Sequence, residues 1–427
     1  MQFYGTNKKS NAVSFKEAVL YGQPRDKGLY FPAEISRFSA DFLNNFKHLS
    51  KAETAFEMIK NYVGDEIPHE RLFKICEETV DFNFPLVKVT DNISALELFH
   101  GETLAFKDVG ARFMSRCLSH FAQDIKQKIV VIVATSGDTG GAVANGFYDI
   151  DGIEVVILYP SGKVSRVQEL QLTTLGKNIT ALEVDGNFDD CQTLAKQALA
   201  DDSIKEKVFL TSANSINVAR WLPQQFYYAF ALQSWNEETP PTISVPSGNF
   251  GNICAGLMAK TSGLPLGNFI AACNANDVVT RYLSSENYDI KPAIATLSNA
   301  MDVGNPSNFV RISEIFKHDF AKLKDSISSL SVSDETTATT IREVFANQHY
   351  LLDPHGAVAF YALRKLLQPN EKGLFLATAH PIKFDSVEEI SGRKTDVPKS
   401  IESLFDKEKV SIKIDVDYEK VKEIILR

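Results

Sequence analysis

The feature that most constrains this chain is the alternation of short apolar runs with helical stretches from about residue 129 onward. The run IVVIVA at 129–134 is wholly apolar and mostly β-branched, which is typical of a strand buried on both faces of a parallel sheet. Similar runs follow: EVVILYP, NITALEV, VFLTSA, TISVPS, FIAACN and GLFLATA. The pattern predicts an α/β fold with open, mostly parallel sheets flanked by helices. Ligands are then expected at the carboxyl ends of the strands.

The first 85 residues follow a different pattern. Three amphipathic stretches, near 41–49, 52–62 and 70–80, have apolar residues at helical spacing. We therefore expect a small, mainly helical N-terminal domain at 1–85. The 427 residues suggest two or three domains. We expect a core of two subdomains at 86–390 and a tail packed on that core at 391–427.

Charge and composition limit the kinds of function that this protein can have. Acidic residues outnumber basic ones by 54 to 45, a net charge of −9, which argues against nucleic-acid binding. No apolar run is long enough to span a bilayer, and the first residues lack the apolar stretch of a signal peptide. Five dispersed cysteines with no CxxC pair argue against disulfides and a cysteine zinc site. The expectation is a cytoplasmic protein without a metal.

Glycine- and hydroxyl-rich loops follow three of the expected strands: TSGDTGG at 135–141, TSANSIN at 211–217 and PSGNFGN at 246–252. Each opens onto a helix, whose first backbone N–H groups favour anions. None of these loops carries the GxxxxGK[ST] or GxGxxG pattern of nucleotide-binding proteins. Each could also be an ordinary strand-to-helix turn, in which glycine supplies the unusual dihedral angles and a Ser, Thr or Asp side chain caps the helix. Three such loops on one α/β fold favour a site for an anionic ligand.

Lys107 is the residue that carries the clearest chemical signal. It follows the apolar pair Ala105 and Phe106 and comes before a helical stretch. Burial there would lower the pKa of its amine, which suits Schiff-base chemistry. A solvated surface lysine is the ordinary alternative. The residues alone leave both interpretations open.

Six motifs, taken together and in order, resemble the threonine synthase family. They are FHGETLAFKDVGARFM, ATSGDTGGAV, SANSIN, VPSGNFGN, TLSNAMDVGNPSN and LATAHPIKF, and the likeness extends to NAVSFKEAV and GLYFP near the start. The resemblance is to the longer bacterial and fungal type. It implies a pyridoxal-phosphate (PLP) enzyme of fold type II, similar to the tryptophan synthase β chain. The implied reaction converts O-phospho-L-homoserine and water to L-threonine and phosphate, the last step of threonine biosynthesis.

The resemblance also implies roles for particular residues. Lys107 is expected to hold PLP as a Schiff base and to shuttle protons, and Thr378 to face the pyridine nitrogen. The cofactor phosphate would be held by the loop Gly248, Asn249, Phe250, Gly251 and Asn252. The substrate carboxylate would lie against Ser136, Asp138 and Thr139. The substrate phosphate would contact residues from Ser212, Asn214, Ser215, Asn217, Arg220, Lys163 and Arg112.

Some points stay open at this stage. A carboxylate at Asp138 would repel an anionic substrate, so it is expected either to cap a helix or to face the cofactor. Arg220 could instead pair with a structural carboxylate. His100, His355 and His380 lack metal-ligand spacing and are expected to pack as polar residues. The alternative functions are another fold-type-II PLP enzyme, such as a serine or threonine dehydratase or a β-replacing synthase, and a non-catalytic PLP-binding relative.

Overall fold

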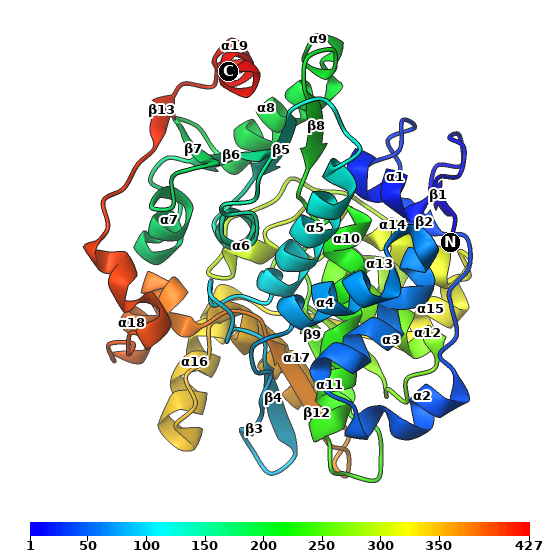
Figure 1. Ribbon diagram of the computed structural model, residues 1–427. Helices are drawn as coiled ribbons and strands as arrows, with labels where there is room; N and C mark the ends of the chain where they lie inside the picture. Colours follow the sequence, from blue (N-terminus) through cyan, green and yellow to red (C-terminus); the bar gives the residue numbers. More distant parts are fainter.

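Two open sheets built largely of parallel strands form the frame of the molecule (Figure 1). The structure, a computed structural model, describes residues 1–427. The first sheet has five strands: β5 (Ile129–Ala134), β6 (Ile153–Pro160), β7 (Ile179–Val184), β8 (Phe209–Ser212) and β13 (Ile412–Ile414). Their order is β13-β7-β6-β5-β8, and every neighbouring pair is parallel. The predicted parallel α/β architecture is confirmed.

The second sheet has six strands. They are β3 (Leu86–Lys88), β4 (Ile93–Glu97), β9 (Thr242–Pro246), β10 (Phe269–Cys273), β11 (Ile327–Ser331) and β12 (Gly373–Ala377). Their order is β11-β10-β9-β12-β4-β3, and only the edge pair β3–β4 is antiparallel. Helix α17 (Pro354–Leu366) packs against the central strands β9, β10 and β12.

The apolar run at 129–134 forms β5, which is buried at all six positions. Its side chains alternate between two separate cores, as the period of a strand requires. Val131 and Val133 face the largest core, which includes residues of α5 (Lys107–Ala122) and α6 (Asp138–Gly146). Val130 and Ile132 face a second core with α8 (Phe188–Ala200) and α19 (Tyr418–Leu426). Helices on both faces explain why the strand carries no polar residue.

The N-terminal residues form the three expected helical stretches and a small sheet that the sequence did not predict. Helices α2 (Ala40–Asn45), α3 (Lys51–Val63) and α4 (His69–Thr79) lie at the three amphipathic stretches. A further helix, α1 (Phe15–Tyr21), comes in the sequence between strands β1 (Phe3–Gly5) and β2 (Tyr30–Pro32), which pair antiparallel. Strands of three residues are too short to show a period-two pattern. Phe3, Phe15 and Tyr62 belong to the same apolar core as α5.

The stretch at 216–235 predicts one long helix with a bend at Pro223, but the structure divides it into three pieces. Helix α10 (Val218–Trp221) is followed by the 3-10 turn η3 (Leu222–Gln225) and then by α11 (Phe226–Ser234). Pro223 lies at the start of the 3-10 turn, where its missing N–H costs least. The expected bend is therefore a change of helix type.

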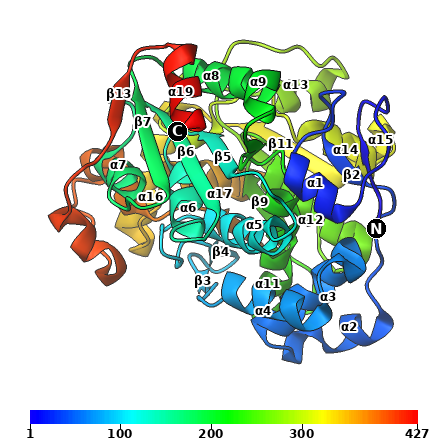
Figure 2. The ribbon, with the colours of Figure 1, turned by 45° about the horizontal axis from the view of Figure 1, so that its top comes forward.

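The polar tail contributes regular structure to the first sheet. Strand β13 extends beside β7, and α19 then packs on α8 (Figure 2). The remaining helices are α7 (Arg166–Thr173), α9 (Asp202–Lys205), α12 (Gly251–Ser262), α13 (Val278–Ser285), α14 (Phe309–Ile315), α15 (Phe320–Ser326), α16 (Asp334–Gln348) and α18 (Asp385–Ser391). The other 3-10 turns are η1 (Phe46–His48), η2 (Gly64–Glu66), η4 (Asn299–Met301), η5 (Pro381–Lys383) and η6 (Lys399–Asp406).

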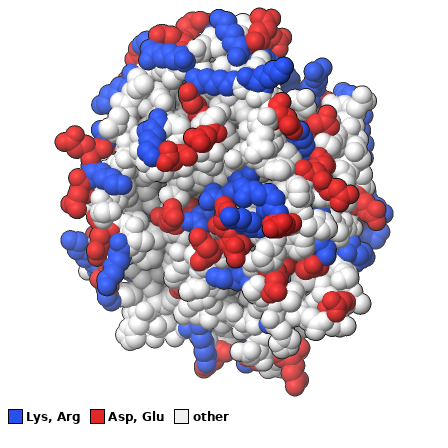
Figure 3. Space-filling model, in the orientation of Figure 1, with Lys and Arg blue, Asp and Glu red and all other residues white.

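Acidic and basic side chains are mixed over the face viewed in Figure 3. Many of them are paired across elements: Arg116 with Glu78 at 3.1 Å and Lys128 with Glu154 at 2.8 Å are examples. Among the helices, none combines the length and apolar character that a membrane span requires.

Candidate active site

A cavity of about 1080 Å³ lies where strands of the two sheets end. Its wall includes residues that follow β5 and β8 of the first sheet and β9 and β12 of the second. The three glycine- and hydroxyl-rich loops therefore meet at one place, as the sequence predicted. Residues of the N-terminal region also line the cavity: Thr6, Asn7, Gln23, Lys27, Gly28 and Leu29. This contribution of the N-terminal region was not predicted from the sequence.

Lys107 is the first residue of α5 and lines the cavity. The segment before it lies antiparallel to the segment after β12: the Phe106 amide donates to the Thr378 carbonyl at 2.9 Å, and the His380 amide donates to the Leu104 carbonyl at 3.0 Å. Leu104 has a left-handed backbone, with φ of 57°. This tight turn fixes the start of α5 against the end of β12.

The Lys107 amine is poorly solvated and makes no hydrogen bond within the protein. Its side chain is 17% exposed, and its Nζ lies 3.9 Å from Oδ2 of Asp138. Burial lowers the pKa of Lys107 below that of an ordinary lysine; Asp138 opposes this shift, whereas the charges of Lys383 and Arg220 add to it. The geometry favours the buried, reactive interpretation over a solvated surface lysine.

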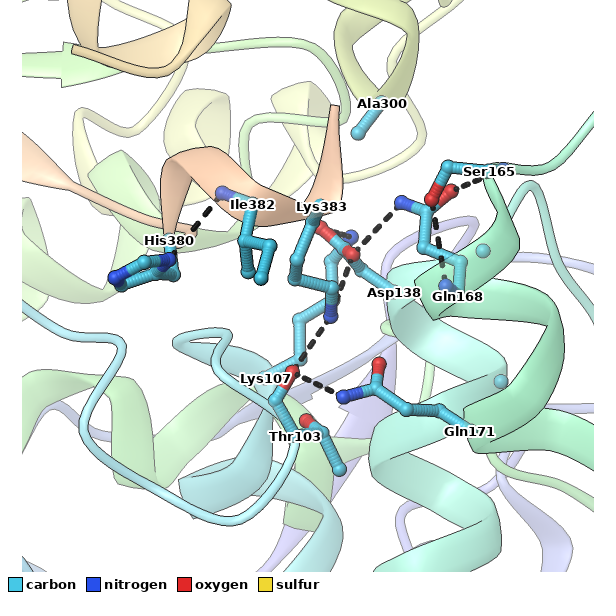
Figure 4. A network of polar contacts seen from close by, with 12 residues as sticks. Thr103, Lys107, Asp138, Ser165, Gln168, Gln171, Ala300, His380, Ile382 and Lys383 are labelled. Carbon is cyan, nitrogen blue, oxygen red and sulfur yellow. Dashed lines mark hydrogen bonds and ion pairs between the residues drawn. The ribbon is translucent and has the colours of Figure 1, made fainter. Parts of the chain in front are cut away.

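Asp138 faces Lys107 and does not cap its own helix. It is the first residue of α6, where no side-chain cap is formed. Its Oδ1 accepts from Nζ of Lys383 at 2.8 Å and from Nε2 of Gln168 at 2.9 Å (Figure 4). Burial alone would raise the pKa of Asp138, but Lys383 and then Lys107 lower it well below its usual range. Of the two expectations for Asp138, helix capping is wrong.

The loop after β9 forms a cup whose backbone amides are free. The amides of Gly248, Asn249, Phe250, Gly251 and Asn252 donate no hydrogen bond within the protein. Phe250 has a left-handed backbone, with φ of 60°, and α12 begins directly after it. The sequence suggested that glycine would supply the unusual dihedral angle, but neither glycine has a positive φ. Gly248 serves close approach instead: a Cβ there would lie 2.5 Å from Cα of Met301.

Side chains of this cup join it to the neighbouring loops. Asn249 donates to Oγ of Ser215 at 2.8 Å and accepts from the Ser307 amide at 2.7 Å. Asn252 accepts from the Tyr228 hydroxyl at 2.8 Å, and its buried Nδ2 has no partner. These contacts hold the loops after β8 and β9 in a fixed relation.

Arg220 is buried beside the loop at 211–217 and has no carboxylate partner. It is 3% exposed and lines the cavity. One of its guanidinium nitrogens donates to the Ala213 carbonyl, and its Nε has no partner. Burial lowers the pKa of Arg220 to about 10. The structure therefore does not show the alternative arrangement, in which Arg220 pairs with a carboxylate. An anion in the cavity would complete this environment.

Thr378 lies directly after β12 and is buried in the cavity wall. Its hydroxyl makes no hydrogen bond within the protein, and its carbonyl accepts from Phe106. Thr378 and Lys107 therefore lie on segments that are directly hydrogen-bonded.

Most of the predicted site residues line this cavity. Beyond those already placed, they are Ser136, Thr139, Ser212, Asn214 and Ser215. Three others do not reach it. Asn217 caps α10 and donates to the Val19 carbonyl at 2.8 Å. Arg112 pairs with Asp81 and with Glu102, and Lys163 is exposed outside the lining.

Lys383 is the residue that the sequence-based prediction missed. It belongs to the motif LATAHPIKF, from which only Thr378 was selected. The sequence feature that could have identified Lys383 as a buried residue is its position between the apolar residues Ile382 and Phe384. Its partner Asp138 is distant in sequence, so only the fold brings the two together.

Comparison with known proteins agrees with this geometry. A family model described as pyridoxal-phosphate dependent enzyme matches residues 84–378. Models for the threonine synthase N terminus and the threonine synthase C-terminal region match residues 2–80 and 356–425. Threonine synthase from Serratia marcescens is 45% identical over 94% of this chain and 93% of its own length.

Solved structures show the same likeness. The crystal structure of threonine synthase from Escherichia coli is 43% identical, with a TM-score of 0.93 over 100% of this chain and 99% of its own. A PLP-bound threonine synthase from Brucella melitensis is 33% identical, again with a TM-score of 0.93 over 100% and 99% of the two chains. Both cover the N-terminal region as well as the two sheets.

Proposed function

Because this chain belongs to the threonine synthase family of PLP-dependent lyases, we propose that its cavity takes O-phospho-L-homoserine and that Lys107 is its catalytic lysine. The proposed products are L-threonine and phosphate. The observation that carries the assignment of Lys107 is its position. A poorly solvated amine, free of hydrogen bonds, lines a cavity together with the glycine cup and Thr378.

The residues present fit the cofactor of the family, PLP. The unpaired amides at 248–252 offer donors for a phosphate at the start of α12. Gly248 keeps the backbone close to Met301, where a side chain would intrude. Thr378 lines the same cavity, and its hydroxyl makes no hydrogen bond within the protein. We propose that the cup holds the cofactor phosphate, that Lys107 carries the cofactor covalently, and that Thr378 hydrogen-bonds its ring nitrogen.

We assign the substrate anions to two different groups of residues. Ser136 lies in the loop after β5 and Thr139 in the first turn of α6, where amides and hydroxyls are available for the substrate carboxylate. Arg220, Asn214 and Ser215 lie at the loop after β8 and would contact the substrate phosphate. The buried guanidinium of Arg220 supports this assignment, because it forms no ion pair with a carboxylate and its Nε has no hydrogen-bond partner within the protein.

Bound PLP supplies an electron sink for negative charge that develops on the substrate carbon. The work of the chain is then to orient the substrate and to move protons. Lys107 Nζ is the group placed to take the proton of the substrate α-carbon and to return it, because burial lowers its pKa and so favours the free amine. Arg220 would stabilise the phosphate as it leaves. A proton must also leave the β-carbon, because its electron pair expels phosphate from the γ-carbon. The γ-carbon then takes up a proton, water adds its hydroxyl to the β-carbon, and a proton returns to the α-carbon.

A single paired assay separates threonine synthase activity from that of the alternative enzymes. Purified protein with PLP is incubated with O-phospho-L-homoserine, and phosphate and threonine are measured in the same sample. The proposal predicts equal amounts of both. A dehydratase or another eliminating enzyme would release phosphate with a keto acid and little threonine. A non-catalytic relative would release neither, and either result would reject the proposed reaction.

We also propose a cytoplasmic location. Its support is the set of five buried cysteines, all of which are free thiols in the structure.

A further inference from the structure

The site contains a second buried lysine whose place differs from that of Lys107. Lys383 is the last residue of η5, and its side chain is 0% exposed. Its Nζ donates to the Thr103 carbonyl at 2.7 Å and lies 2.8 Å from Oδ1 of Asp138. Figure 4 shows Lys383, Asp138 and Lys107 close together, with Gln168 and Gln171 beside them. Lys383 does not line the cavity.

The two oxygens of Asp138 have different partners. Oδ1 is bound by Lys383 and by Gln168. Oδ2 faces Lys107 but remains 3.9 Å from its Nζ, longer than a charge-assisted hydrogen bond. The carboxylate is therefore held on the Lys383 side. Without Lys383, Asp138 could move toward the Lys107 amine and form a direct ion pair.

We propose that Lys383 is a positioning residue that keeps Asp138 from pairing directly with Lys107, so that Lys107 remains available as a free amine. This inference rests on the proposed role of Lys107. It also explains how two lysines near one carboxylate are distinguished. Lys383 is fixed as a charged donor by Asp138 and by the Thr103 carbonyl. Lys107 has no hydrogen bond and faces the cavity.

The charges around Lys107 oppose one another. Asp138 favours the ammonium form, whereas Lys383 and Arg220 disfavour it. A fourth charged group, Asp108, is buried near Lys383 and Arg220. Its carboxylate accepts hydrogen bonds from the amide and the hydroxyl of Thr103. Replacing Lys383 with a neutral residue removes its repulsion of the Lys107 ammonium. It also leaves Asp138 free to approach that ammonium. Both effects favour the ammonium form of Lys107.

The test measures the protonation of Lys107 directly. The full-length chain, freed of cofactor, is labelled with trace acetic anhydride between pH 6 and 11, and the Lys107 peptide is quantified by mass spectrometry. Lys383→Met should raise the midpoint of labelling by about one pH unit, which makes labelling about tenfold slower at a fixed lower pH. Asp138→Asn should lower the midpoint, because Lys383 and Arg220 then act unopposed.

Lys383→Gln keeps the test decisive if Lys383→Met does not fold, because its amide can still donate to the Thr103 carbonyl. The double variant Lys383→Met/Asp138→Asn separates an effect through Asp138 from direct repulsion. Removing both members of a buried pair costs less than removing one. With Asp138 neutral, Lys383→Met should raise the midpoint by less than it does in the wild type, because only the direct repulsion is removed. Gln171→Leu is the matched control, since Gln171 is buried and donates to the same Thr103 carbonyl without a charge. It should leave the midpoint unchanged.

Shifts in the same direction for the two single variants, or no shift in either, would overturn the inference. The inference is also overturned if Lys383→Met raises the midpoint in the Asp138→Asn background as much as it does in the wild type, because Lys383 would then not act through Asp138. The proposed function is tested separately, because this measurement uses neither cofactor nor substrate. Opposite shifts combined with attachment of PLP to a different lysine would retain the charge relation and reject the role of Lys107.

Discussion

The amide of Phe106 donates to the carbonyl of Thr378 at 2.9 Å, so the residue before Lys107 is bonded to the residue that ends the β12 segment. An antiparallel bridge between Ala105 and Ala379 extends this contact. A ligand held by Lys107 is thereby placed at a fixed distance from the Thr378 hydroxyl. The relation of these two side chains is thus set by backbone hydrogen bonds, which side-chain substitutions at Thr378 leave in place.

Thr378→Ser and Thr378→Val test the hydroxyl itself. Serine retains the hydrogen-bonding group and should keep most of the activity. Valine keeps the shape but removes the group, which should cost about 1–3 kcal/mol if the ring nitrogen is left unpaired in a buried site. Phosphate release is measured at saturating PLP, with absorbance spectra of the bound cofactor. Equal activity of the two variants would show that Thr378 only packs the end of its strand.

Gly248→Ala and Gly251→Ala should differ from each other. A Cβ at Gly248 would lie 2.5 Å from the Met301 backbone, so alanine should destabilise the cofactor-free protein by about 1–3 kcal/mol. At Gly251 the nearest atom would be Nδ2 of Asn308 at 3.4 Å, an ordinary contact. Gly251→Ala should therefore mainly weaken PLP binding. Denaturant unfolding without cofactor and PLP titration separate the effects, and equal unfolding curves for the two variants would contradict the prediction.

Arg220→Met should raise KM for O-phospho-L-homoserine at least about tenfold, because a desolvated charge-assisted contact to the phosphate is lost. Arg220→Lys should recover only part of this loss, since lysine cannot reproduce the planar fork. Arg112→Met is the matched control, because Arg112 pairs with Asp81 and Glu102 away from the cavity. Steady-state kinetics for the three variants decide the point. An increase in KM for Arg112→Met equal to that for Arg220→Met would contradict it.

Acid should weaken the fold partly through His380. Its Nδ1 accepts from the Ile382 amide at 3.2 Å at the start of η5, the turn that carries Lys383. Burial lowers the pKa of His380 from 6.5 to about 4, although Glu97 opposes the shift. Between these values the unfolded chain binds more protons than the folded chain. Stability should therefore be fully present above pH 6.5 and should fall as the pH is lowered toward 4.

His380→Asn provides the comparison, because asparagine can still accept the Ile382 amide but does not titrate. Denaturant unfolding is measured at several pH values from 4 to 7. The wild type should lose more stability than the variant, by at most about 1.4 kcal/mol per pH unit. Parallel curves for the two proteins would show that His380 is not buried in its neutral form.

The sequence predicted those parts of the fold and site whose signals are local. Apolar runs such as 129–134 identified buried strands, since a strand covered on both faces must be apolar throughout. Motifs around Lys107, the cup and Thr378 identified residues that the structure brings to one cavity. Strand order and the contribution of the N-terminal region were not predicted, because both depend on contacts between distant segments.

The substrate contacts show the same limit. Arg112 and Arg220 are both arginines beside motif residues, and the sequence could not rank them. In the structure, Arg112 has two carboxylate partners, whereas Arg220 has none. Lys383 was not predicted, because its role depends on its contact with Asp138. Only the fold brings these two residues together. The left-handed conformation of Phe250 was assigned to the glycines because glycine adopts it most easily.

The most direct test of the account is to identify the lysine that carries PLP. The holoprotein is reduced with borohydride, digested and mapped by mass spectrometry, with Lys107→Ala as the control. We predict the pyridoxyl group on the Lys107 peptide of the wild type, and a folded Lys107→Ala protein that binds PLP weakly and carries no reduced adduct. A pyridoxyl group on Lys383, or on any lysine other than Lys107, would contradict the assignment of the site.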